Sequence, residues 1–533
     1  MRKFYSLLLM LLSAVGLWAQ TADLKVSNST SSPEHVYLLA NAKGELMQAN
    51  TYKGGVSNAG KFAFFPGGAE GAYKLYSIGE SKWVSYTKAG SYSHGSGKTS
   101  LVDDKDAANA WNITVQTRNN AKVYQFAPYK NDGTAANIYM NWYANEEGKT
   151  VGFWTDAASA DNGSAWKLTL LPNSGSSYYI QDKHCAFLNL DVLGAEPKNE
   201  SSQNQLSTLT ANPASFKIEI TGDGKWKISR TSDNLYLGQH IPGNGEADRS
   251  WNSWLTSTPI EWKAELIVEN GDVYLMLKNE SGTHDGYLGT ANHTNGQPLY
   301  VNTSGAERLR LRLVEGGATK TTLTYTYTYN GTALDASYNE SREAVVGALY
   351  PLPTRVPFGT TCDQKTGTVS SAGESVAFAL RNSLPFVPCT TVDGNTNWYY
   401  LKMHSNDKRY IQNVGTQISW ADEDIKLDLT DLESMSWAFV GDPINGFKLI
   451  NKKSNAYVVT SGTDQSAATL TGAVDNATTF MYSPSQTSGS QYFCLKNGDY
   501  YLNAQATVGQ WNKNDAGSTI ETENAIPVKF STD

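Results

Sequence analysis

Four short segments of this 533-residue chain place tryptophan beside asparagine or aspartate. An indole offers an apolar face on which the C–H face of a sugar ring stacks, and neighbouring amides and carboxylates exchange hydrogen bonds with its hydroxyls. The candidate carbohydrate-binding residues are Asn141 with Trp142, Trp154 with Asp156, Trp251 and Trp254 with Asn252 and Asp248, and Trp511 with Asn512. The Trp251/Trp254 pair fits best, because two indoles so close in sequence are difficult to bury in a polar loop. In every segment the alternative is a loop tryptophan that folds back over its own domain.

Motifs for catalysis or metal binding are incomplete. The segment Gly95-Ser96-Gly97-Lys98-Thr99 imitates the end of a phosphate-binding loop, but Tyr92 stands where the first glycine is needed, which favours a hairpin turn. The chain has no His-Glu-x-x-His or Gly-x-Ser-x-Gly motif, and His284, Asp285 and His293 do not supply three ligands at metal spacing. We therefore expect no metal, no cofactor and no enzymatic activity. A hydrolase whose two carboxylates meet only on folding is an alternative.

The elements that must position these residues recur at a fixed period. Strands rich in aromatic residues open at Tyr179, Trp226 and Tyr274, in steps of 47 and 48 residues, and three comparable strands near the C-terminus open in steps of 47 and 46. Each cycle closes on another strand, and the tryptophans at these closing positions are Trp111, Trp166, Trp262 and Trp437. One such unit cannot cover its own apolar face, but three around a pseudo-threefold axis close six strands into a barrel. We therefore expect the opening and closing aromatics to lie in barrel cores.

The predicted fold class is all-β, with three β-trefoil domains and a small β-sandwich between the second and the third. From Thr322 to Tyr329 threonine alternates with leucine and tyrosine and runs into Asn330-Gly331, which predicts a half-buried strand followed by a turn. A tyrosine platform for glycans is the alternative for that strand. The predicted boundaries are 1–19 for a signal peptide, 20–33 for a spacer, 34–172 and 175–316 for two trefoils, 317–394 for an Ig-like sandwich, and 395–533 for the third trefoil.

The pattern resembles the ricin B-type β-trefoil, the module of R-type lectins. That family closes its lobes with Gln-x-Trp, and this chain keeps the tryptophan without the glutamine in Asn109-Ala110-Trp111, Ser164-Ala165-Trp166, Ile260-Glu261-Trp262 and Met435-Ser436-Trp437. The stretch from Thr322 onward also resembles a sandwich-plus-trefoil tail of secreted bacterial proteins, notably at Leu384-Pro385-Phe386 and 398–404. The resemblance implies three trefoils and lectin-like carbohydrate binding, while the missing glutamine departs from the family pattern.

The N-terminal sequence predicts where the protein is located, and the net charge disfavours one class of ligand. Arg2 and Lys3 precede an apolar run that ends at Trp18, which is typical of a secretory signal peptide, so we expect a secreted protein without membrane insertion. A net charge of −8 supplies no positive surface for nucleic acid. Cys362 and Cys389 lie in one short segment and are candidates for pairing.

We accordingly expect a carbohydrate-binding protein whose partners are glycans. Several sites on one chain would allow multivalent binding. A protein partner, or a purely structural array of trefoils, is the alternative from another functional class.

Overall fold

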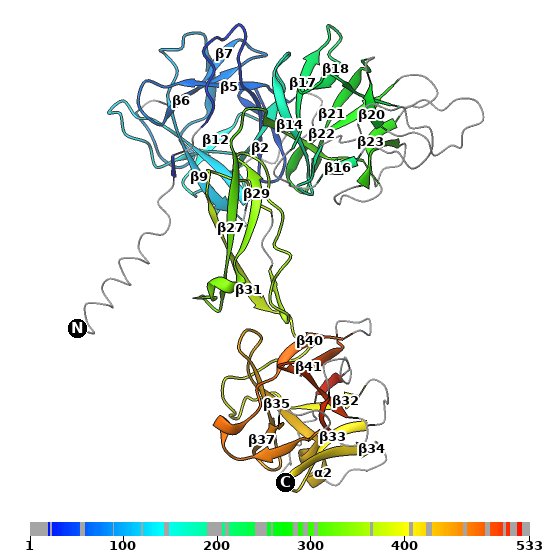
Figure 1. Cartoon of the computed structure of the whole chain (residues 1–533). Coiled ribbons are helices and arrows are strands. Elements are labelled where there is room, and N and C mark those ends of the chain that lie inside the picture. The colour runs from blue at the N-terminus through cyan, green and yellow to red at the C-terminus, as the bar shows by residue number, and fades with distance from the viewer. Residues whose placement is uncertain are drawn as a thin grey trace. The chain divides into compact units, whose positions relative to one another are not determined.

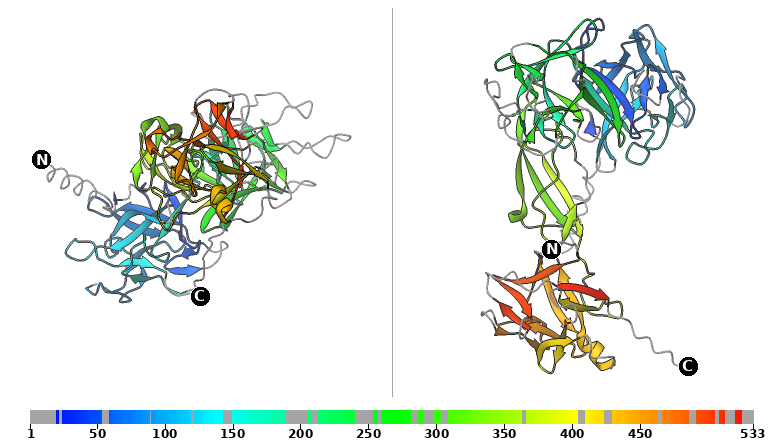
Figure 2. Two further views of the ribbon diagram at one scale, coloured as in Figure 1. Left: turned by 90° about the horizontal axis from the view of Figure 1, so that it is seen from below. Right: turned by 90° about the vertical axis from the view of Figure 1, so that its right-hand side faces the viewer.

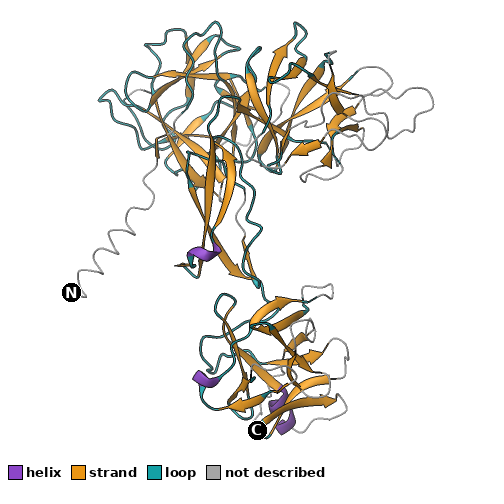
Figure 3. Cartoon of the chain, viewed as in Figure 1, coloured by secondary structure: helices purple, strands orange, loops and turns teal. Residues whose placement is uncertain are grey.

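In the computed structural model the chain divides into two compact units. The first comprises Met1–Thr324, Ser341–Leu352 and Gln364–Val376, and the second comprises Tyr325–Glu340, Pro353–Asp363 and Ala377–Asp533. The structure describes residues 20–21, 24–53, 59–88, 90–118, 121–142, 149–188, 205–207, 213–239, 253–256, 259–280, 286–290, 297–302, 308–362, 366–403, 409–422, 429–461, 466–485, 491–504, 508–511 and 520–524. Strands dominate these residues (Figure 1, Figure 3), and α2 (Leu429–Met435) is their one α-helix. The all-β fold class is confirmed, whereas the predicted signal peptide lies outside the described residues.

In the first block six antiparallel strands close into a barrel. The ring runs through β2 (Val36–Asn41), β5 (Phe62–Pro66), β6 (Ala72–Ser77), β9 (Trp111–Arg118), β10 (Ala121–Pro128) and β13 (Trp166–Leu171), which pairs back with β2. A pair of shorter strands follows every second barrel strand: β3 (Leu46–Gln48) with β4 (Thr51–Lys53), β7 (Lys82–Tyr86) with β8 (Thr99–Val102), and β11 (Tyr139–Asn141) with β12 (Gly152–Trp154). This is the arrangement that three repeated units predict.

The second block repeats the same scheme (Figure 2). Its ring is β14 (Ser177–Asp182), β17 (Ser215–Ile220), β18 (Trp226–Arg230), β21 (Trp262–Glu269), β22 (Asp272–Asn279) and β26 (Leu311–Glu315), closed by pairing of β26 with β14. Its outer strands are β15 (Phe187–Leu188), β16 (Gln205–Ser207), β19 (Tyr236–Gln239), β20 (Ser253–Thr256), β23 (Gly286–Gly289), β24 (Gln297–Pro298) and β25 (Tyr300–Asn302). As in the first block, shorter outer strands follow every second barrel strand in the sequence.

The C-terminal block lies in the second unit. Its ring is β32 (Tyr399–Met403), β35 (Ser436–Asp442), β36 (Gly446–Asn451), β40 (Met481–Pro484), β41 (Phe493–Asn497) and β44 (Ile520–Asn524), with a bridge between Phe447 and Phe480 joining β36 to the strand before β41. The outer elements are β33 (Arg409–Val414), β34 (Gln417–Asp422), β37 (Ala456–Val459), β38 (Ser466–Ala467), β39 (Thr469–Thr471), η4 (Val474–Asn476), β42 (Tyr500–Ala504) and β43 (Val508–Trp511).

The closing tryptophans share one role. Trp111, Trp166, Trp262 and Trp437 are each 0% exposed, which confirms the predicted core positions. Each indole N–H donates to a backbone carbonyl of the hairpin that precedes it in sequence, namely Val84, Met140, Leu237 and Ile411, at 2.8–3.2 Å. A buried indole N–H needs such an acceptor. Each tryptophan therefore fills the barrel core and also links the preceding hairpin to the barrel through a hydrogen bond.

In the second block two of the three opening aromatics, Tyr179 and Tyr274, do not lie in the barrel core as predicted. Tyr178, next to the predicted Tyr179, packs in the barrel core, and Leu275 does so next to Tyr274. Tyr179 instead packs against Phe187 and Val314 in a separate buried cluster. Side chains alternate between the two faces of a strand, so a difference of one residue moves a ring from the core to the outer face.

Opening strands frequently end in a buried polar residue that fixes the following turn. Asn41 and Asn451 are both 0% exposed. The Asn41 side chain accepts hydrogen bonds from the backbone N–H groups of Lys43 and Glu45, and Asn451 Oδ1 accepts one from the backbone N–H of Ser454. Since a buried turn must satisfy its backbone groups internally, these side chains position the outer hairpins.

Between residues 320 and 382 the described residues contribute five strands to one sheet. Its strands are β27 (Lys320–Tyr329), β28 (Thr332–Ala333), β29 (Glu340–Val345), β30 (Thr360–Cys362) and β31 (Ser375–Asn382), and η3 (Ala336–Tyr338) lies between two of them. Both β27 and β31 contribute residues to each compact unit. Tyr325 and Tyr327 are buried, so these rings are structural and offer no glycan platform. The turn at Asn330-Gly331 is present, with positive φ at both residues as a tight hairpin requires.

The described part of the predicted spacer 20–33 is not a free linker. β1 (Gln20–Thr21) pairs with β9, and the backbone N–H of Leu24 donates to the Tyr73 hydroxyl. The backbone N–H of Ser27 donates to the carbonyl of Phe64, and Ser27 is 0% exposed. This segment therefore packs as part of the first block.

A side-chain contact between the first two blocks predicts acid sensitivity. His35 Nδ1 lies 2.6 Å from Glu315 Oε1, and the hydrogen bond from His35 holds the pKa of Glu315 below its usual value. A depressed carboxyl pKa stabilises the fold above the unfolded value of about 4.3, and that stability is lost as the pH falls through the folded value. We expect Glu315→Gln to lower the urea midpoint at pH ~7 and to match the unchanged protein near pH ~2. An equal difference at both pH values would contradict this linkage.

Candidate functional site

The hairpin of β11 and β12 presents an aromatic outer face. Tyr139 and Trp154 are register partners, so their side chains lie on the same face, while the alternating residues Met140 and Phe153 are fully buried. The Trp154 indole N–H donates to Asp156 Oδ2 at 3.1 Å, and Asp156 is exposed. This arrangement holds the half-buried Trp154 ring in one orientation beside a carboxylate.

A loop from the neighbouring hairpin completes this face. The backbone N–H of Gly95 donates to the carbonyl of Phe153, and a bridge joins Lys98 to Gly152. These contacts place the exposed His94 ring beside Trp154, with 3.4 Å between ring centroids and 53° between planes. Two aromatic residues, an imidazole and a carboxylate therefore converge on one surface, where they can stack on an apolar face and bind hydroxyl groups.

The loop itself is well packed. Tyr86 and Tyr92 stack with ring centroids 5.3 Å apart, and the Tyr86 hydroxyl is hydrogen-bonded to Ser96 Oγ. Burial raises the pKa of Tyr86, so this hydroxyl stays protonated at neutral pH. Since β7 and β8 pair across these residues, the segment 95–99 forms part of a hairpin connection, as predicted, and not a phosphate-binding loop.

Asn141 and Trp142 lie in the interior of the first block, which corrects their assignment to a surface site. Asn141 is 2% exposed and its side-chain amide donates to Ser164 Oγ and to Asp161. Trp142 is 6% exposed, packs in the barrel core, and has the Lys43 ammonium 4.6 Å from its ring centroid. Neither side chain offers a sugar a free face, because both are almost fully buried.

The Trp251/Trp254 candidate is only partly described. Asp248, Trp251 and Asn252 lie outside the described residues. Trp254 belongs to β20, where it pairs with Gly238, rather than to the predicted polar loop. The short apolar run Trp254-Leu255 lies opposite Leu237 and Gly238, and this pairing explains the strand.

Trp511 is likewise at the end of a strand, β43, where it is the register partner of Tyr501. The other residue of this candidate, Asn512, lies outside the described residues. The remaining candidate with described side chains is therefore Trp154 with Asp156.

Two residues of this site were missed in the sequence. Tyr139 joins Trp154 through strand register, and His94 reaches it from 60 positions earlier in the chain. The alternation Ile138-Tyr139-Met140 predicts a strand with Tyr139 facing outward. Only the folded structure shows that its partner strand is β12. For His94 the sequence carries no signal.

Within the described residues no cluster of three or more His, Cys, Asp or Glu side chains is placed to hold a metal ion. All four cysteines are thiols in the structure, so Cys362 and Cys389 are not joined. Burial raises the pKa of Cys185 to about 12, as expected for an inert interior thiol. Among the described helices, none has the length and apolar character needed to span a membrane.

Comparison with known proteins gives coarse structural matches. Neither a family model nor a curated protein sequence matches this chain. A mosquitocidal holotoxin matches with 11% identity and a TM-score of 0.25, covering 95% of this chain and 70% of that chain. The hemolytic lectin CEL-III matches with 12% identity and a TM-score of 0.19, covering 65% of this chain and 64% of its own length. A lectin is thus among the structures that this chain resembles coarsely.

The prediction that the protein is not an enzyme is contradicted by the same comparison. An arabinofuranosidase complexed with arabinofuranosyl-alpha-1,2-xylobiose matches with 13% identity and a TM-score of 0.21, covering 95% of this chain and 96% of that chain. Further arabinofuranosidase structures and an exo-beta-1,3-galactanase also match. The exclusion of catalysis is therefore withdrawn.

Proposed function

We propose that this protein binds carbohydrate through lectin-like β-trefoil modules, and that one site lies on the outer face of the β11–β12 hairpin. The observation that carries the proposal is the outward pair of Tyr139 and Trp154 beside the exposed carboxylate of Asp156. Aromatic faces with adjacent hydrogen-bonding groups are the combination that sugar rings require.

Pre-organisation supports this proposal. Strand pairing holds Tyr139 and Trp154 together, and the indole hydrogen bond to Asp156 limits rotation of the ring. A ligand that stacks there has little side-chain motion left to freeze, which lowers the entropy cost of binding. The face is open, so we expect one site to bind on the order of millimolar to micromolar. Sites on other modules would raise the avidity of the whole chain if they engage one surface together.

Removal of the Trp154 ring tests the site. We expect Trp154→Ala in the full chain to weaken binding of an oligosaccharide by about 5- to 30-fold, because a stacked aromatic contact is worth about 1–2 kcal/mol. Isothermal titration with the best ligand from a glycan array measures this change.

Phe358→Ala is the matched control, because Phe358 is an aromatic residue of the second unit that is 64% exposed. Its affinity should equal that of the unchanged protein. A folded Trp154→Ala variant with unchanged affinity would remove this site from the proposal.

A further inference from the structure

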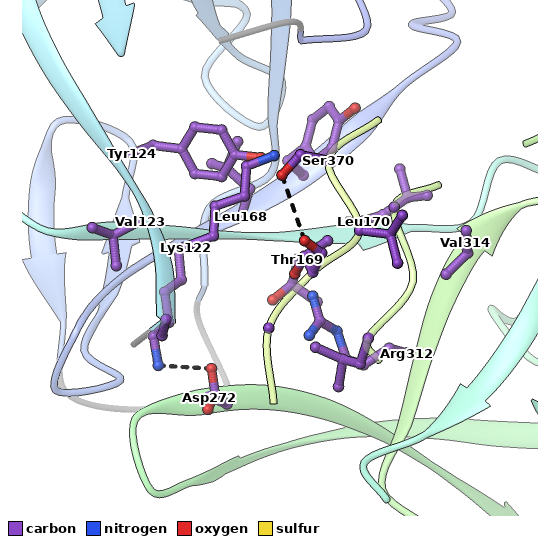
Figure 4. Close-up of a pocket in the computed structure, with 18 of the residues that line it drawn as sticks. Lys122, Val123, Tyr124, Leu168, Thr169, Leu170, Asp272, Arg312, Val314 and Ser370 are labelled. Atoms are coloured by element: carbon purple, nitrogen blue, oxygen red, sulfur yellow. Dashed lines mark hydrogen bonds and ion pairs between the residues drawn. The ribbon is translucent and has the colours of Figure 1, made fainter. Parts of the chain in front are cut away.

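A second feature lies inside the first compact unit, away from the β11–β12 face. A cavity of about 610 Å³ is lined by strands of the first block, strands of the second block, and the segments 346–349 and 366–370 (Figure 4). Cavities of this size hold ligands as large as a disaccharide, since ligand pockets span about 300–1,000 Å³. The cavity is therefore large enough for a small saccharide.

Strands of both blocks contribute charged side chains to the lining of this cavity. On β26 the flanking residues Leu311 and Leu313 are buried, so Arg312 projects from the opposite face of the strand. On β10 Lys122 and Tyr124 lie on the same face of the strand as Phe126, and Tyr124 packs at the edge of the barrel core of the first block. Arg312, Lys122 and Tyr124 all line the cavity (Figure 4).

The lining is strongly basic in an acidic protein. Five cationic side chains line the cavity against two carboxylates, although the whole chain carries a net charge of −8. Both carboxylates are already paired: Asp272 with Lys167 at 2.7 Å, and Glu315 with His35. Among the described residues no carboxylate forms an ion pair with Arg312 or Lys122. Uncompensated cations in a confined space favour an anionic ligand.

The rest of the wall suits a sugar better than a bare anion. Tyr124 lies half-buried with the Lys122 ammonium 5.5 Å from its ring centroid, and Leu168 and Leu170 on β13 add apolar surface. Tyrosine rings accept the C–H face of a sugar, whereas an inorganic ion gains nothing from them. The guanidinium of Arg312 has the planar fork that binds a carboxylate through two hydrogen bonds.

We propose that this cavity binds an acidic saccharide, with the sugar carboxylate on Arg312, the Lys122 ammonium as a second positive charge, and Tyr124 against the ring. The site is separate from the one on the β11–β12 hairpin and goes beyond the function proposed above. It takes a negatively charged sugar class that the outer face, with its own carboxylate at Asp156, does not favour.

Titration of the full chain with digalacturonic acid tests this site, and galactobiose of the same linkage is the neutral comparison. We expect digalacturonic acid to bind more tightly than galactobiose. Arg312→Gln should weaken digalacturonic acid binding by about 10- to 100-fold, because hydrogen bonds to charged groups are worth about 1.5–3 kcal/mol. Arg312→Lys should lose part of that affinity, since it keeps the charge without the fork.

Lys225→Gln is the matched control, because Lys225 is a cation of the second block outside the cavity, and it should leave the affinity unchanged. Near-ultraviolet circular dichroism checks that each variant is folded. Lys122→Gln is a second, independent test should Arg312→Gln fail to fold, and it should also weaken binding.

Several outcomes would overturn the assignment: no binding of digalacturonic acid, equal binding of the two disaccharides, unchanged affinity in folded Arg312→Gln, or inorganic phosphate bound as tightly as the acidic disaccharide. Trp154→Ala separates the two proposals, because it should weaken binding at the hairpin and leave the titration with digalacturonic acid unchanged.

Discussion

Replacing Trp437 by alanine is expected to lower the free energy of unfolding of the C-terminal block by about 3–5 kcal/mol. The side chain is 0% exposed and packs in the barrel core with Phe439 and Leu401. Its removal forfeits the transfer free energy of an indole and leaves a cavity that a closed barrel cannot fill. The carbonyl of Ile411 also loses the indole N–H that lies 2.8 Å away. Calorimetry of the full chain should show the corresponding transition at a much lower temperature.

Val414→Ala is the control for this experiment. Val414 lies in the same block but is 54% exposed, so its truncation should cost less than about 1 kcal/mol. Trp437→Phe should fall between the two, because it keeps part of the ring volume and loses the hydrogen bond. Equal costs for Trp437→Ala and Val414→Ala would mean that the closing tryptophans do not hold the barrels together.

Replacing Gln181 by methionine is expected to cost about 2–4 kcal/mol although the side chain keeps nearly the same volume. Gln181 is 0% exposed; its Nε2 donates to the Leu349 carbonyl and its Oε1 accepts from the Leu349 N–H, both at 2.8 Å. Leu349 is itself buried, so methionine leaves a donor and an acceptor without partners in the interior. Urea denaturation measures the loss, and hydrogen exchange at the Leu349 amide locates it.

Gln417 provides the comparison, since it is an exposed glutamine at the turn of β33 and β34. Gln417→Met should change stability by no more than about 0.5 kcal/mol. If Gln181→Met were as mild, or if the Leu349 amide kept its protection, the segment 341–352 would be held by its apolar contacts alone.

Much of the architecture follows from the sequence, because a barrel core is made of large side chains at a fixed period. Trp111, Trp166, Trp262 and Trp437 stand at the predicted closing positions and are buried without exception. The spacing identifies the residues that occupy equivalent positions in successive repeats. Burial of apolar area then determines which face of each strand enters the core. Register is harder to predict: Tyr178 and Tyr179 are adjacent tyrosines, and only the pairing with β26 decides which one enters the core.

The candidate site could be predicted only in part. Trp154 and Asp156 are neighbours in sequence, and their side chains meet in the structure as the pattern indicates. Asn141 shows the opposite case, since the Asp161 and Ser164 groups that satisfy it lie 20 and 23 positions away. A polar neighbour in sequence is therefore no guide to exposure when buried polar groups find partners through the fold. The cavity beside Arg312 is assembled from several separate strands, which linear sequence cannot bring together.

The central claim is carbohydrate binding, and a glycan array probed with the full chain tests it most directly. The array should include neutral and acidic glycans, and the same array should be probed with Trp154→Ala and Arg312→Gln. We predict that the unchanged chain binds a defined set of glycans, that Trp154→Ala loses signal on the neutral ones, and that Arg312→Gln loses signal on the acidic ones. A folded, unchanged chain that binds no glycan would contradict the claim and leave a protein partner as the alternative.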